Sequence, residues 1–199
     1  MTTKTEQAVG EKLAKATGLT PVLGSRGQRS IQIDDRARFL SEQVPAGQRA
    51  APISEPMLFE QPYITGPRFP APKDLKDYLA SSKPDFLYVT PTQIEVFEVT
   101  VDNGFTLTPQ LKGMSVSGSA SKAGIAHKLE QVEKTAEYLI QRYPDHVIVY
   151  NIQTVGQVPA HVIEKLRTEL VKARALVGSA GGKGSFDIVV RAAETFSIS

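Results

Sequence analysis

The sequence predicts an α/β protein whose central sheet is mixed rather than purely parallel. Segments with helical periodicity alternate with short runs rich in β-branched and aromatic residues. Residues 83–101 read as two strands joined by a Pro-containing turn, and such a hairpin is antiparallel. A chain of 199 residues with no evident linker predicts one domain over residues 1–199.

The composition excludes several classes of function. The chain has no cysteine, which excludes disulfides, thiolate zinc sites and a cysteine nucleophile, and only three histidines, which argue against an all-histidine zinc site. A net charge of +2 does not by itself indicate nucleic-acid binding. No apolar run approaches the roughly 20 residues of a membrane span, and no apolar signal core is visible at the N-terminus. We expect a cytoplasmic protein, although a protein delivered into a target cell by a specialised machine would look the same.

The N-terminal segment predicts a helix over residues 5–17. Val9 belongs to an apolar stripe at helical spacing, and Gly18 provides a C-terminal cap. At about 100° per residue, Glu6 lies beside this stripe and Glu11 lies nearly opposite, towards solvent.

The next part of the chain is rich in proline. Residues 19–33 are ambiguous and could hold a strand. Residues 45–72 contain seven prolines, which disfavours a helix or a central strand and predicts an extended insertion around the core. This insertion is either a surface loop without function or an arm that contacts substrate or a partner. Residues 73–81 predict a short helix.

The C-terminal half alternates helices and strands. The predicted elements are a Gly/Ser-rich loop at residues 106–121, a helix at 122–142, a strand at 146–153, a helix at 159–177 and a strand at 186–192. The Gly/Ser-rich loop follows the hairpin and could order on substrate binding, as lids do.

The register of the hairpin pairs two acids. With a loop at residues 90–93, or a two-residue loop at its centre, Asp85 lies opposite Glu98 on one face of the hairpin. Strand alternation adds Thr100 to this face and places Glu95 on the other. Two facing carboxylates repel, so such a pair favours a bound cation.

Hard divalent ions such as Mg²⁺ bind through one or two carboxylates, with waters and substrate phosphates completing the shell. Such an ion lowers the pKa of a bound water and stabilises charge in phosphoryl transfer. The alternative is an ordinary hairpin with charged surface residues, because one Asp–Glu pair is not a specific motif.

These residues resemble the PD-(D/E)XK nuclease superfamily. Pro84-Asp85 is similar to the Pro-Asp that opens one strand of the family motif, and Glu98-Val99-Thr100 to the acid-x-Lys on the next strand. A helix and a further strand follow in the expected order, and Glu6 matches the acid of an upstream helix. The resemblance covers the Glu6 helix and residues 83–153, and leaves out the insertion and roughly the last 40 residues.

The resemblance implies a restriction-endonuclease-like core and a metal-dependent endonuclease that uses Mg²⁺ or Mn²⁺. Asp85 and Glu98 would hold the ion, with Glu6 and the Val99 carbonyl assisting. The implied substrate is nucleic acid, with DNA slightly favoured over RNA. Single-domain members with divergent motifs include toxin domains used between bacteria, for which an immunity protein is the expected partner.

One departure from the family motif concerns its lysine, which orients or activates the attacking water. Here Thr100 stands at that position and cannot supply a positive charge. Lys128, about 60° from the apolar centre of the helix at residues 122–142, is a candidate replacement, and Gln131 and Tyr138 follow on the same flank. The alternative is an ordinary solvated flank.

Substrate contacts are predicted from Tyr138, from Lys122 and from Lys183, which lies in a Gly-rich loop whose backbone amides could approach phosphates. The alternative here is an ordinary helix and linker. If Thr100 marks lost chemistry, the same fold would serve as a catalytically inactive module that binds nucleic acid or protein. A third possibility, a structural protein unrelated to nucleases, predicts that the hairpin acids lie apart.

Overall fold

The computed structural model describes residues 4–23, 49–62, 84–100, 119–154, 158 and 160–192, without the side chains of residues 100, 119–128 and 192. Its helices and strands are α1 (Lys4–Thr17), β1 (Val22–Leu23), β2 (Met57–Glu60), β3 (Phe86–Val89), β4 (Gln93–Thr100), α4 (Ser119–Arg142), β5 (Val147–Thr154), α5 (Ala160–Ser179) and β6 (Ser185–Ala192). None of these helices is both long and apolar enough to cross a membrane.

The six strands form one mixed sheet in which spatial order follows chain order. Strand β1 is parallel to β2, and β2, β3 and β4 form an antiparallel meander. Strands β4, β5 and β6 are parallel, so each of the two connections between them crosses back along the sheet through a helix. The prediction of an α/β protein with a mixed sheet is therefore confirmed.

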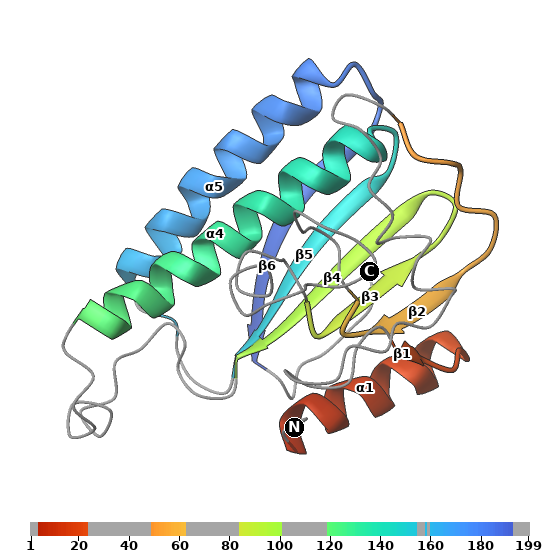
Figure 1. The fold of residues 1–199 in the computed structure, drawn as a ribbon, viewed down its shortest axis with the longest axis horizontal. Helices are drawn as coiled ribbons and strands as arrows, with labels where there is room; N and C mark the ends of the chain where they lie inside the picture. The colour runs from red at the N-terminus through yellow and green to blue at the C-terminus, as the bar shows by residue number, and fades with distance from the viewer. Residues whose placement is uncertain are drawn as a thin grey trace, which may run out of the picture.

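The helices of the described residues, α1, α4 and α5, cover the sheet (Figure 1). Helices α4 and α5 pack against one another and lie over β5 and β6, whereas α1 packs on the other face, against β2 and β4. The carboxyl ends of β4, β5 and β6 meet at one edge, because Thr100 pairs with Thr154 and Thr154 pairs with Ala192. Open α/β sheets bind ligands at this edge.

Two hydrophobic clusters fill the two faces. The larger lies beneath α4 and α5, and the smaller joins α1 to the middle of the sheet through residues such as Leu13, Phe86 and Phe97. Gly10 allows α1 to approach closely, because a Cβ atom there would lie 2.8 Å from the Phe86 ring.

Most of the predicted elements agree with the structure. The helix predicted over residues 5–17 is α1, and Gly18 ends it with a φ of 69° and an N–H that donates to the Ala14 carbonyl. Glu11 is exposed and Glu6 half-buried, as the helical wheel predicts. The helices at 122–142 and 159–177 and the last two strands correspond to α4, α5, β5 and β6.

The prediction of an extended insertion without a central strand over residues 45–72 is partly wrong. Strand β2 lies within it, between β1 and β3, and Leu58 and Phe59 are almost fully buried. The prolines flank this strand at positions 56 and 62, so its backbone N–H groups remain free to pair. Counting prolines over a long window therefore hid a proline-free run of five residues.

Three predictions lie mostly or wholly outside the described residues: a strand within 19–33, the helix at 73–81, and the loop at 106–121. The last three residues of that loop are described and belong to α4 instead.

Candidate active site

The hairpin has the register that the sequence predicts. Tyr88 pairs with Glu95 and Phe86 with Phe97, and the Thr90 N–H donates to the Gln93 carbonyl across a two-residue loop. One step beyond Phe86, the same register brings Asp85 opposite Glu98.

The carboxylate of Asp85 extends the ladder of β3 and β4. Its Oδ2 atom accepts a hydrogen bond from the Val99 N–H at 2.7 Å. Asp85 is half-buried, and Glu98 is 6% exposed. A carboxylate has about four lone-pair sites, so one N–H bond does not exhaust the acceptor capacity of Asp85. The two acids therefore meet near the carboxyl end of β4, largely out of solvent.

Strand alternation separates Glu98 from Glu95. Phe97 and Val99, which share the face of Glu95, belong to the cluster under α1, whereas Val96 belongs to the cluster under α4 and α5. Glu95 is fully buried and accepts hydrogen bonds from Gln93 at 2.8 Å and Asn151 at 3.2 Å. Its oxygens are thus held by amides on the face away from the Asp85–Glu98 pair, as the register predicts.

Tyr150 of β5 lies on the same face of the sheet as the two acids. It pairs with Val96, so its side chain shares the face of Glu98, and it is 2% exposed. Burial raises the pKa of its phenol well above 10, and the negative charges of Glu98 and Asp85 raise it further. The hydroxyl therefore stays protonated near both carboxylates.

One flank of α4 overlooks β4. Glu133 and Glu137 line the seam with α5, and Gln131 lies about 160° around the helix from Glu133. Because α5 lies over β6 and α4 over β5, the flank of Gln131 faces the β4 side of the sheet. Thr135, on the same flank, is fully buried.

Gln131 is roughly level with Glu98. Ile152 pairs with Glu98 and lies about 16 Å along β5 from Val147, where the strand begins. The same distance counted back along α4 from its end at Arg142 is about 11 residues, which reaches Gln131. The Gln131 Oε1 atom is buried and has no hydrogen-bond partner among the described residues. A buried amide oxygen without a donor is a candidate ligand for a cation or an ordered water.

Three predicted residues are placed only by their backbones. Thr100 ends β4 opposite Thr154, and Lys122 and Lys128 belong to the N-terminal half of α4, towards the carboxyl end of β4. Their side chains lie outside the described part of the chain.

Glu6 lies on the α1 side of the sheet. Its charge, after burial, raises the pKa of Glu60 at the end of β2, so these two carboxylates are neighbours. Within residues 4–23, 49–62, 84–100 and the other described ranges, no group of three His, Cys, Asp or Glu side chains could hold a metal ion. The structure thus brings Asp85 and Glu98 together without showing Glu6 as a third ligand.

Two predicted substrate contacts lie elsewhere. The Arg142 guanidinium stacks 3.7 Å above the Tyr138 ring, in the last turns of α4. Lys183 precedes β6, and its N–H donates to Asp145 Oδ1 at 2.9 Å, at the opposite edge of the sheet from Glu98. Neither residue joins the carboxylate pair.

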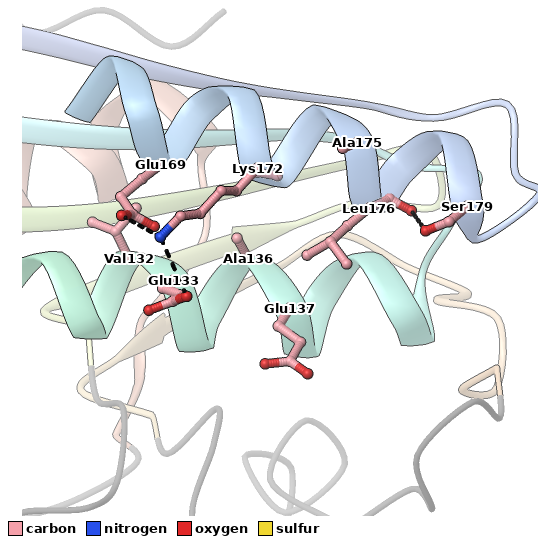
Figure 2. A pocket seen from close by; sticks show the side chains of 10 residues that line it. Val132, Glu133, Ala136, Glu137, Glu169, Lys172, Ala175, Leu176 and Ser179 are labelled. Atoms are coloured by element: carbon pink, nitrogen blue, oxygen red, sulfur yellow. Dashed lines mark hydrogen bonds and ion pairs between the residues drawn. The ribbon is translucent and has the colours of Figure 1, made fainter. Parts of the chain in front are cut away.

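A separate groove of about 620 Å³ follows the outer seam of α4 and α5 (Figure 2). Lys172 lies 2.9 Å from Glu169 and 3.6 Å from Glu133, so the positive charge on this seam is paired with acids. Arg167 and Arg174 of α5 also pair with acids. The groove is a packing seam between helices, and α5 does not present an uncompensated basic stripe.

Tyr150 is the residue that sequence reasoning missed. A single tyrosine stands in the apolar strand of residues 146–153, and a buried phenol needs a polar partner, which was the available signal. Its partner depends on the register between β4 and β5, which the sequence does not fix.

Comparisons with protein-family models, with curated proteins and with solved structures give no match to this chain.

Proposed function

We propose that this protein is a metal-dependent nuclease with a PD-(D/E)XK-type, restriction-endonuclease-like core. The observation that carries the proposal is the hairpin register, which sets Asp85 opposite Glu98 and gives Asp85 a hydrogen bond from the Val99 N–H.

The order of the elements supports the same proposal. Helix α1, the meander β2–β3–β4, helix α4 and the parallel strand β5 follow one another, with the acids on the middle hairpin. This is the order that the resemblance implies. Strand β1 extends the sheet on one side, and β6, which follows α5, extends it on the other.

The residues present suit a hard divalent ion, Mg²⁺ or Mn²⁺. Asp85, Glu98 and the Val99 carbonyl would provide oxygen ligands, and the buried Gln131 amide oxygen, which has no hydrogen-bond donor in the described chain, would be a further one. When bound, such an ion lowers the pKa of water and stabilises charge on a phosphate. Glu6 remains a proposed additional ligand.

The remaining roles fall to α4 and to the end of β4. Gln131 would orient the attacking water through its amide, and Lys128 would supply the positive charge that Thr100 lacks. Lys122, nearer the start of α4, would contact the substrate backbone. Because three cations of α5 are paired with acids, phosphate contacts are expected from the α4 side of the molecule.

The test is cleavage of plasmid DNA and of total RNA in Mg²⁺, in Mn²⁺ and in EDTA. We expect metal-dependent cleavage, with DNA slightly preferred, and a loss of at least 100-fold in Asp85→Asn and Glu98→Gln. Asp145→Asn is the matched control, because Asp145 lies at the opposite edge of the sheet. Failure of the wild type to cleave either polymer, with no metal binding by calorimetry, would reject the proposal.

Thr100 favours a second candidate, an inactive module of the same fold that binds nucleic acid or protein. Lys128→Ala separates the two: an active enzyme that uses this lysine loses cleavage and keeps metal binding. Metal binding without cleavage in the wild type would support the inactive module. Use as a toxin domain between bacteria, with an immunity protein as partner, rests on the resemblance alone.

A further inference from the structure

Tyr150 occupies an apolar surrounding on the face that carries the acids. On its own strand Ile148 and Ile152 share its face, Val96 lies opposite in β4, and Ile188 lies opposite in β6. A tyrosine that is 2% exposed in such a place keeps its hydroxyl only if a polar group receives it.

Glu98 lies two residues along β4 from Val96, on the face that Tyr150 shares, and Asp85 lies opposite Glu98, so the charges of both acids act on this phenol. An ionised carboxylate only accepts hydrogen bonds, whereas a neutral phenol can donate one. The Val99 N–H donates to Asp85 from the side of the hairpin, and a phenol proton would restrain the pair from the side of β5.

We infer that Tyr150 is a positioning residue, whose hydroxyl donates to the Asp85–Glu98 pair and fixes the orientation in which the carboxylates bind a divalent ion. The part that concerns the ion rests on the proposed function, whereas the hydrogen bond does not. Groups that orient metal-binding carboxylates typically change metal affinity about 10- to 100-fold when removed.

Tyr143 provides a matched control. It is another buried tyrosine, 4% exposed, but it lies just beyond α4, at the other edge of the sheet. Its neighbours include Tyr138, Arg142 and His146, and the pair is not among the charges that act on it. Removing either hydroxyl deletes one buried oxygen, but only Tyr150→Phe removes the hydroxyl that we assign to the acids.

The first test is proton NMR of the tyrosine hydroxyls in the metal-free protein. The resonance that disappears in Tyr150→Phe should move in Glu98→Gln or Asp85→Asn, and the resonance assigned by Tyr143→Phe should not. A Tyr150 hydroxyl that exchanges freely with water, or that neither acid variant moves, would overturn the inference. This test does not need metal. If Tyr150→Phe fails to fold, through-space contacts of the hydroxyl proton with Val96 and Ile152 assign the resonance instead, and the acid variants still decide the outcome.

The second test is calorimetric titration with Mn²⁺ and Mg²⁺. We expect about tenfold weaker binding in Tyr150→Phe and unchanged binding in Tyr143→Phe. Equal affinity in Tyr150→Phe and the wild type would overturn the positioning role. A wild type that binds neither ion would count against the proposed function, and the hydroxyl resonances would still decide whether Tyr150 donates to the pair.

Discussion

Glu95 and Glu98 stand three residues apart on β4 and have different environments. Glu95 is buried and held by the amides of Gln93 and Asn151, while Glu98 faces Asp85 and Tyr150 on the other side of the sheet. Because side chains alternate along a strand, a shift of one residue in register would exchange these environments. At the residue scale, register assigns one glutamate to structure and the other to the candidate site.

Glu95→Ala is expected to destabilise the fold without removing the site. It removes the acceptor that Glu95 provides to the buried Asn151 amide and to the half-buried Gln93 amide, which should cost about 3 kcal/mol. Urea denaturation measures this loss, and Glu11→Ala, on an exposed face of α1, should change stability by less than about 0.5 kcal/mol. Metal affinity in the folded Glu95→Ala protein should equal that of the wild type, and a loss similar to that of Glu98→Gln would contradict the assignment.

The helices act as covers of opposite faces. Helix α1 seals the middle of the sheet next to the hairpin, through Leu13 and the close contact of Gly10 with Phe86. Helix α4 turns one flank to α5 and the other, with Gln131 and Thr135, to β4. At the element scale, the hairpin acids depend on α1 for rigidity and on α4 for the remaining groups of the site.

Gly10→Ala should therefore destabilise the protein. The added methyl would lie 2.8 Å and 2.9 Å from Phe86 ring atoms, and overpacking of this kind costs about 1–3 kcal/mol. Thermal or urea unfolding gives the value. The control is Gly178→Ala in α5, where no atom lies within 4 Å and the better helix propensity of alanine should stabilise by up to about 1 kcal/mol. Equal effects of the two substitutions would show that α1 does not pack as closely as described.

The two ends of the parallel strands differ. The acids lie towards the carboxyl ends of β4, β5 and β6, and at the opposite edge hydrogen bonds connect the loops. There Asp145 accepts from the Lys183 N–H and pairs with Arg49 at 2.7 Å, and these partners lower its pKa. The Gly184 N–H also donates to the Pro144 carbonyl, which joins the α5–β6 loop to the end of α4.

The stability of the whole molecule is expected to fall in mild acid. His146 lies at the edge where these loops connect, is 9% exposed, and burial lowers its pKa from 6.5. The unfolded chain therefore binds more protons between about pH 6.5 and the lowered pKa, and stability decreases as the pH falls through that window. Urea denaturation at several pH values should show this slope in the wild type and in His161→Gln, an exposed control, but not in His146→Gln. The same slope in His146→Gln would assign the acid sensitivity to other groups.

The sequence by itself determined the elements with clear periodicity and the pairing within the hairpin. A tight turn leaves one register, so the opposition of Asp85 and Glu98 and the separation of Glu95 follow from local residues alone. Helices α1, α4 and α5 have apolar stripes that are equally local signals. Strand β2 was missed because the prolines around it, at positions 56 and 62, masked a short run that only pairing with β3 makes a strand.

Only the tertiary structure decided which distant residues join the acids. The register of β5 against β4 brings Tyr150 to them, and the packing of α5 on one side of α4 turns Gln131 towards β4. The tertiary structure also placed Lys183 beside Asp145, at the edge of the sheet opposite to Glu98, and the Gly-rich sequence around Lys183 did not indicate this position. These relations depend on contacts between segments more than 30 residues apart in sequence, and such contacts are set by the packing of the whole sheet rather than by any local pattern.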